Sequence, residues 1–264
     1  MEIQYSNELQ KIVTDKISGS KELQEKLNSY FYLNYSTLPD LLNVLISLKN
    51  EFATFQSLQS YLDNLIKAYN SGGKDKFFEE VRNFISSENL IYGKLFQKLY
   101  PEIKRSLKII TLSNSKTLFE IFKLLSQKKK GIEIIISESR PLNEGRILAE
   151  KLVSSNIKVQ LITEAMIPAY VKICNVAIIG ADAVLKNRNV VNKVGSKLLA
   201  ITANYYKKPF YVVADRTKIK SDNKFLQKEK NSSEIWNYNN KYLTIKNYYF
   251  EIIEKKLITK IITD

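Results

Sequence analysis

Asp182 and the pair Asn192-Lys193 are the residues of this chain whose types and spacing point most directly to chemistry. Asp182 follows an apolar run in the stretch IIGADAVLKNRNVVNKVGS, residues 178–196, and the amide–ammonium pair comes ten residues later. The stretch matches neither the GxxxxGK[ST] nor the GxGxxG phosphate-binding loop. A carboxylate accepts hydrogen bonds from ligand hydroxyls, or transfers a proton when burial raises its pKa. An ammonium beside the free N–H groups of a helix start attracts anions. These groups together indicate a hydroxyl-rich, anionic ligand such as a sugar phosphate.

Further candidate ligand contacts precede this stretch. Arg140 is suited to a bidentate phosphate contact, and Gly145 follows it closely. Ser113 and Ser115 stand before a helical segment, where their hydroxyls could donate to phosphate. Each residue also has a purely structural interpretation: a surface arginine, serines that cap a helix, and for Asp182 a turn. Asn192 and Lys193 would then be an ordinary helix start with a solvated lysine.

The residue types also exclude several chemistries. The chain contains no histidine, which rules out Ser-His-Asp and Cys-His nucleophiles and histidine-bound metals. Its one cysteine, Cys174, precedes an apolar run and is expected in the core. We therefore expect no metal and no cofactor. One cysteine allows no internal disulfide, and no run of about 18 apolar residues occurs, so we expect a cytoplasmic protein without membrane contact.

The net charge of +14 suggests nucleic acid as a partner. The lysines are scattered, however, and their longest run is only residues 128–130. No RNP, zinc-knuckle or KH pattern is present. RNA binding is therefore the least favoured hypothesis, and it requires that lysines gather on one face of the fold.

The elements that must position these residues divide the chain in two. Residues 1–105 have apolar residues at three- and four-residue intervals, which predicts a helical N-terminal domain, with a helix broken at 71–73. In residues 106–264, short apolar runs alternate with helical patterns. The apolar runs are 107–112, 132–136, 159–162, 176–179 and 210–213, and the helical segments are 116–128, 143–154, 165–173 and 190–206.

This alternation predicts an α/β fold, in which a Rossmann-like, mostly parallel sheet carries helices on both faces. Ligands of such sheets bind beyond the carboxyl ends of the strands. Asp182, Ser113 and Arg140 follow three of the predicted strands. Residues 217–241, rich in Lys and Asn, are predicted to form a long surface loop.

Four stretches occur in one order: SESRPLNEGRILAEKL, VAIIGADAVLKNRNVVNKVGSKLLAI, KKPFYVVAD and NYYFEIIEKKLITKIITD. Together they resemble the translation initiation factor 2B alpha/beta/delta family, which includes methylthioribose-1-phosphate and ribose-1,5-bisphosphate isomerases. The resemblance implies a helical N-terminal domain, a dimerising Rossmann-like domain and a site for a phosphorylated ligand. The apolar, aromatic tail at 248–250 suits an interface core, which favours a homodimer or a higher oligomer.

In the isomerases of this family, a cysteine after the first strand and the aspartate of the GAD sequence carry the chemistry. The aspartate corresponds to Asp182, but Ser113 stands at the cysteine position. The isomerases also have an Arg-Gly pair near the N-terminus, and its nearest counterpart here is Ser18-Gly19. The initiation-factor branch lacks the cysteine as well.

Three hypotheses follow. The first is a non-catalytic regulatory or assembly subunit that binds a sugar phosphate or nucleotide, with an initiation factor 2 subunit as a protein partner. The second is a sugar-phosphate aldose–ketose isomerase that uses Asp182 and Ser113. The third is a basic RNA-associated protein. We favour the first, because a serine hydroxyl needs a base that this histidine-free chain does not supply.

Overall fold

The computed structural model describes residues 5–16, 18–38 and 40–264, apart from the side chains at positions 85, 86 and 89. The chain folds as two compact units, Met1–Gly93 and Lys94–Asp264, which we call the helical unit and the sheet unit. The expected split into a helical domain, 1–105, and a ligand-binding and dimerisation domain, 106–264, stays a prediction. Within the described residues, no helix is both long and apolar enough to cross a membrane.

The described residues of the helical unit form three helices and the first part of a fourth. The helices are α1 (Asn7–Val13), α2 (Ser20–Asn34), α3 (Leu41–Glu51) and α4 (Gln56–Ile103). Leucine and aromatic side chains at helical spacing meet in one core, with Leu27, Phe31 and Leu45 fully buried. The predicted break is confirmed, because Gly72 and Gly73 have non-helical backbone angles inside α4.

The sheet unit is built on six parallel strands, which confirms the predicted α/β class. The strands are β1 (Lys108–Leu112), β2 (Glu133–Ser137), β3 (Lys158–Ile162), β4 (Val176–Ile179), β7 (Phe210–Val213) and β9 (Lys260–Ile262). Their order across the sheet is β3-β2-β1-β4-β7-β9. Strands β1, β2, β4 and β7 are buried along nearly their whole length, as expected of a sheet covered on both faces.

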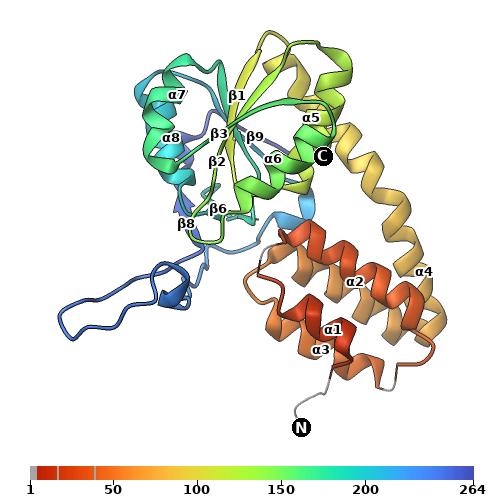
Figure 1. The fold of residues 1–264 in the computed structure, drawn as a ribbon. Helices are drawn as coiled ribbons and strands as arrows, with labels where there is room; N and C mark the ends of the chain where they lie inside the picture. The colour runs from red at the N-terminus through yellow and green to blue at the C-terminus, as the bar shows by residue number, and fades with distance from the viewer. Residues whose placement is uncertain (1–4, 17, 39) are drawn as a thin grey trace. The chain divides into compact units, whose positions relative to one another are not determined.

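Helices cover both faces of this sheet (Figure 1). They are α5 (Lys116–Lys128), α6 (Glu144–Ser154), α7 (Ile167–Ile173) and α8 (Ser196–Tyr205). Helix α5 packs against α6, and α7 packs against α8 on the opposite face. Short 3-10 helices are η1 (Glu164–Met166), between β3 and α7, η2 (Arg216–Lys218), after β7, η3 (Ser232–Glu234), in the segment that follows, and η4 (Lys255–Leu257), near the end of the chain. Cys174 lies in the core, as predicted.

A second, antiparallel sheet contains β5 (Ala183–Val184), β6 (Val190–Lys193) and β8 (Phe250–Ile253), in the order β5-β6-β8. None of the apolar runs in the sequence indicates this sheet. Residues 190–193, expected to open a helix, pair instead with Phe250–Ile253, so the helix prediction is wrong there. The helix begins only at Ser196. Strand β6 also pairs with nearby β5, but β5 has two residues, and all four residues of β6 pair with β8 about sixty residues away, which leaves little local signal.

The predicted surface loop is largely confirmed. Most of residues 219–247 are exposed, and Figure 1 shows this segment extending from the sheet unit. The prediction is wrong at its first residues, because Lys218 in η2 is 5% exposed.

Candidate functional site

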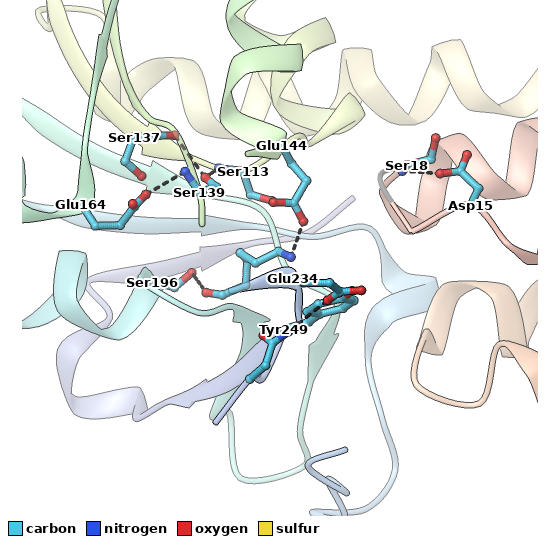
Figure 2. A network of polar contacts seen from close by, with 12 residues as sticks. Asp15, Ser18, Ser113, Ser137, Ser139, Glu144, Glu164, Ser196, Glu234 and Tyr249 are labelled. Atoms are coloured by element: carbon cyan, nitrogen blue, oxygen red, sulfur yellow. Dashed lines mark hydrogen bonds and ion pairs between the residues drawn. The ribbon is translucent and has the colours of Figure 1, made fainter. Parts of the chain in front are cut away.

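Two serine turns meet where β1 and β2 end (Figure 2). The Ser113 N–H donates to Ser139 Oγ at 2.7 Å, and the Ser139 N–H donates to Glu164 Oε1 at 2.7 Å. Ser113 and Ser139 have φ angles of 64° and 66°, a left-handed conformation that non-glycine residues seldom adopt. Backbone strain of this kind gathers at ligand and catalytic sites. The carboxyl ends of β1 and β2 are therefore a candidate ligand-binding or catalytic site.

Ser113 and Ser115 differ in what their hydroxyls do. Ser115 Oγ caps α5 by accepting the Leu118 N–H at 3.3 Å, so the capping interpretation holds for this residue. A Cβ added at Gly180, after β4, would lie 2.9 Å from Ser115 Oγ, which places β4 and β1 side by side here. The Ser113 hydroxyl makes no hydrogen bond to any residue in the described part of the chain.

Lys193 is buried in an ion pair with Glu144, the first residue of α6. The two side chains are 6% and 5% exposed, and the Lys193 ammonium also lies 4.6 Å from the centre of the Tyr249 ring. Figure 2 shows Glu144 in this contact. Among the described residues, Glu144 Oε2 is buried without a hydrogen-bond partner. The positive charge of Lys193 is thus already matched inside the protein.

Asn192 and Lys193 lie on β6 and do not open a helix. Asn192 Nδ2 donates to Ser196 Oγ at 2.9 Å, and Ser196 Oγ donates to the Lys193 carbonyl at 2.6 Å. These bonds hold the turn between β6 and α8, where Gly195 has a φ of 97°. That conformation strains any residue with a Cβ, so the turn requires glycine.

The start of α8 is occupied by Glu251 of β8. Its Oε1 accepts the Lys197 N–H at 2.9 Å. Burial raises the pKa of Glu251, while hydrogen bonds from the backbone of Lys197, Gly195 and Ser196 act to lower it. An internal carboxylate therefore takes the anion position that the sequence analysis assigned to a ligand at this helix start.

Asp182 is half-buried after β4, and its N–H donates to the Val191 carbonyl at 2.9 Å. Its carboxylate has no hydrogen bond or ion pair within the described ranges. Burial raises the pKa of Asp182, the charges of Lys218 and Lys193 oppose that shift, and Glu144 reinforces it. We call Glu144, Asp182, Lys193 and Lys218 the strand-end cluster. Its net charge is zero when all four residues are ionised.

The remaining predicted residues are Arg140, on the turn between β2 and α6, and Gly145, the second residue of α6. Arg140 is exposed, and its Nη2 donates to the Ile235 carbonyl at 3.1 Å. Gly145 packs so tightly that an added Cβ would lie 1.9 Å from the Ser137 carbonyl oxygen. A close approach of α6 to β2 thus explains this glycine. Its predicted ligand contact is untested, as are those of the other site residues.

Sequence reasoning missed Glu144, Lys218 and Glu164. Glu144 resembles any acid in the first turn of a helix, where it complements the helix dipole. Lys218 lies in a stretch dominated by solvated lysines. Only the long-range contacts show that both are buried. Within the described residues, no group of three His, Cys, Asp or Glu side chains is arranged to hold a metal ion.

Comparison with known proteins extends these observations. A family model described as the Initiation factor 2 subunit family matches residues 1–264. An eIF-2B subunit 2-like translation initiation factor from Pyrococcus furiosus is 38% identical over 59% of this chain, and the match spans 55% of that relative. A ribose 1,5-bisphosphate isomerase from Methanocaldococcus jannaschii is 26% identical over 94% of this chain and 83% of its own length.

Solved structures of initiation factor 2B proteins are also similar to this chain. The translation initiation factor eIF-2B of Pyrococcus horikoshii has a TM-score of 0.79 and 26% identity, covering 96% of this chain and 92% of that one. A chain of the tetrameric eIF2B-beta2-delta2 complex from C. thermophilum has a TM-score of 0.65 and 14% identity, covering 96% and 86%. The second likeness concerns the fold alone.

Proposed function

Because the chain belongs to the Initiation factor 2 subunit family, we propose that it is a non-catalytic regulatory or assembly subunit that binds a phosphorylated metabolite, a sugar phosphate or a nucleotide. The ligand lies at the carboxyl ends of the parallel strands. The observation that carries this proposal is the Asp182 carboxylate, half-buried after β4 and without a hydrogen bond or ion pair in the described part of the chain. A half-buried acceptor without a partner gains most from ligand hydroxyls that donate to it.

The contacts within the protein decide which residues are available to the phosphate and which to the hydroxyl groups of the ligand. Lys193 is held by Glu144, and Glu251 fills the start of α8, so neither position offers an open cation or free N–H groups to phosphate. Arg140 is exposed, and its one hydrogen bond goes to a neutral carbonyl. Its guanidinium therefore supplies the charge for phosphate, while Asp182 holds the hydroxyl groups. This assignment replaces Lys193 with Arg140 as the phosphate residue.

The proposal that the bound ligand is not isomerised depends on Ser113. Its hydroxyl makes no hydrogen bond to a described residue, so no base within that range activates it. The one thiol cannot replace the cysteine of the isomerases, because Cys174 is 1% exposed and burial raises its pKa to about 12. A nucleophile of the isomerase type is therefore missing from the cluster.

Thermal shift tests the binding proposal. Ribose 1,5-bisphosphate, methylthioribose 1-phosphate, AMP and GMP are titrated separately. A true ligand at about 100 times its Kd adds about 2.7 kcal/mol to the free energy of unfolding. Arg140→Ala should remove the shift and Asp182→Asn should weaken it. Arg146→Ala, which removes an exposed arginine paired with Glu138, is the matched control and should keep the shift. If none of the four compounds shifts the midpoint, the proposal fails.

The second candidate is a sugar-phosphate isomerase. It is favoured by the likeness to the ribose 1,5-bisphosphate isomerase over 94% of this chain and by the raised pKa of Asp182, which suits proton transfer. Ketose formed by the wild-type protein and lost in both Ser113→Ala and Asp182→Asn would establish it.

We also propose that the chain self-associates and contacts an initiation factor 2 subunit. A structural neighbour is a tetrameric complex. The aromatic tail is unsuited to the contact, because Tyr249 is 8% exposed and bonded to Glu234. The apolar side chains exposed on η1, α7 and α8 suit it better, and these are Met166, Ile173, Leu198, Ile201 and Tyr205. Light scattering should show a dimer or larger species that Ile201→Asp dissociates and Leu90→Asp, on the exposed surface of α4, does not. A monomeric wild-type protein would refute self-association.

A further inference from the structure

The long loop of the sheet unit carries a platform of exposed aromatic rings. We call residues 229–248 the arm and residues 236–243 its tip. The two limbs of the arm meet at its base, where Glu229 pairs with Tyr248 and the Lys230 N–H donates to the Asn247 carbonyl at 2.8 Å. At the tip, Trp236, Tyr238 and Tyr242 are 56%, 50% and 87% exposed. Large aromatic side chains at such exposure indicate a binding surface.

The rings are arranged as a stack. Trp236 and Tyr238 lie with ring centres 4.5 Å apart and planes 10° from parallel. The Lys241 ammonium lies 4.8 Å from the centre of the Tyr242 ring. Each of these two rings covers the inner face of the other. The outer face of each ring is the surface that a further planar group can cover. Nucleic-acid bases are planar and stack on aromatic faces, and a lysine beside them meets the phosphate backbone.

The composition of the tip favours a nucleic acid over a protein. The sequence WNYNNKYL has three aromatic residues, three asparagines and a lysine, with Leu243 as its one aliphatic residue and no acid. Asparagine side chains offer both donors and acceptors to base edges. Lys241 and the absence of acids give the tip itself a positive charge, which is complementary to a phosphate backbone.

The base of the arm is held in place. Asn247 Nδ2 donates to the Asn231 carbonyl at 2.7 Å and to Glu234 Oε2 at 2.9 Å. The Tyr249 hydroxyl donates to the same Glu234 oxygen at 2.5 Å. Arg140 Nη2 holds the Ile235 carbonyl, directly before the tip. The platform is therefore tied to the sheet unit, which lowers the ordering cost of binding.

We propose that the tip of the arm binds single-stranded nucleic acid, with bases stacked on Trp236 and Tyr238 and the backbone near Lys241. This site is additional to the metabolite site, and its stacking residues are not part of that site. The loop that the sequence marked only as a surface loop is, in this account, a binding element for RNA or single-stranded DNA. Stacking of this kind tolerates different base sequences, because every base has a planar face.

The test is titration of fluorescein-labelled oligouridine and oligoadenine, followed by anisotropy and by the emission of Trp236, the one tryptophan of the chain. Binding should quench Trp236 and weaken between about 50 and 200 mM salt. The double variant Trp236→Ala, Tyr238→Ala should bind at least about tenfold more weakly, since each stacked base contributes substantially. Tyr32→Ala, which removes an exposed aromatic of α2, is the control and should bind as the wild type does.

Three results would overturn the proposal. The wild-type protein could fail to bind either oligonucleotide, or the double variant could bind as tightly as the wild type, which would place binding on lysines elsewhere. The double variant could instead lose the oligomeric mass seen by light scattering, which would make the tip a protein contact. Thermal shift with the phosphorylated compounds should be the same for the double variant and the wild type, so failure here is separable from failure of the metabolite site.

Discussion

The strand-end cluster and the arm contain the same kinds of charged residue in opposite settings. In the cluster, Lys193 and Glu144 are paired at about one-twentieth exposure. On the arm, Lys246 and Glu229 are also paired, at 3.1 Å, but with 59% and 46% of their side chains exposed. Burial removes both members of the first pair from water, so each depends on the other. Water solvates the second pair, whose members are nearly independent.

The difference shows why net charge is a poor guide to where an anion binds. The lysine that the sequence analysis placed at the phosphate is neutralised from within, and the exposed cations lie elsewhere, on Arg140 and on the arm. A charge is available to a ligand only where the fold has not already matched it.

Glu144→Gln should have the largest effect. The variant leaves the Lys193 charge buried without a carboxylate and should lower the free energy of unfolding by about 3–5 kcal/mol in urea denaturation. Glu229→Gln removes the matching carboxylate of the exposed arm pair and should cost less than about 1 kcal/mol. Adding Lys193→Met to Glu144→Gln should restore part of the loss, because no uncompensated charge then remains. Equal costs for the two single variants would remove the contrast between the regions.

Gly145→Ala should have the next largest effect. The new Cβ would lie 1.9 Å from the Ser137 carbonyl oxygen, a backbone atom that cannot rotate away, so α6 must move from β2. Overpacking of this kind costs about 1–3 kcal/mol, measurable by urea denaturation. Gly93→Ala is the control, because no atom lies within 4 Å of a Cβ there and the helix should gain about 1 kcal/mol. A stability of Gly145→Ala equal to that of the wild type would show that α6 adjusts freely.

Asp182→Asn should have a smaller effect of opposite sign. Burial raises the folded-state pKa of Asp182 above its ordinary value of 3.8, so the wild-type protein loses stability as pH rises through that pKa. The variant lacks this loss and should be more stable than the wild type at pH 7, with the difference vanishing below the ordinary pKa. Asp222→Asn should show the reverse trend, because hydrogen bonds hold the pKa of exposed Asp222 below its usual value. Unfolding curves across pH would decide, and a variant less stable than the wild type at pH 7 would contradict the expectation.

The sequence predicted most of the main sheet because five of its six strands, all except β9, have a local signal. The runs 107–112, 132–136 and 210–213 coincide with β1, β2 and β7 within one residue. Strand β9 was missed, since three residues near the end of the chain, only one of them buried, carry too little apolar pattern to register. The helix prediction failed at β6 because its nearby partner β5 has only two residues and its longer partner β8 is distant in the sequence.

The site was less accessible to sequence reasoning than the fold. Asp182, Ser113 and Arg140 were found because each follows a strand, and parallel strands bring their ends to one edge. Whether the charge of a side chain is already matched depends on contacts between segments far apart in the chain. Glu251 caps α8 from 54 residues away, and Glu144 reaches Lys193 across the sheet edge. No local pattern shows which charges are matched in this way.

The central claim, binding without turnover, is tested most directly by NMR on one sample. Ribose 1,5-bisphosphate is mixed with stoichiometric wild-type protein, and its phosphorus resonances are followed over hours, with Arg140→Ala in parallel. The account predicts shifted resonances with the wild-type protein, no shift with Arg140→Ala, and an unchanged aldose in both samples. Ketose accumulating with the wild-type protein and absent with Ser113→Ala would contradict it.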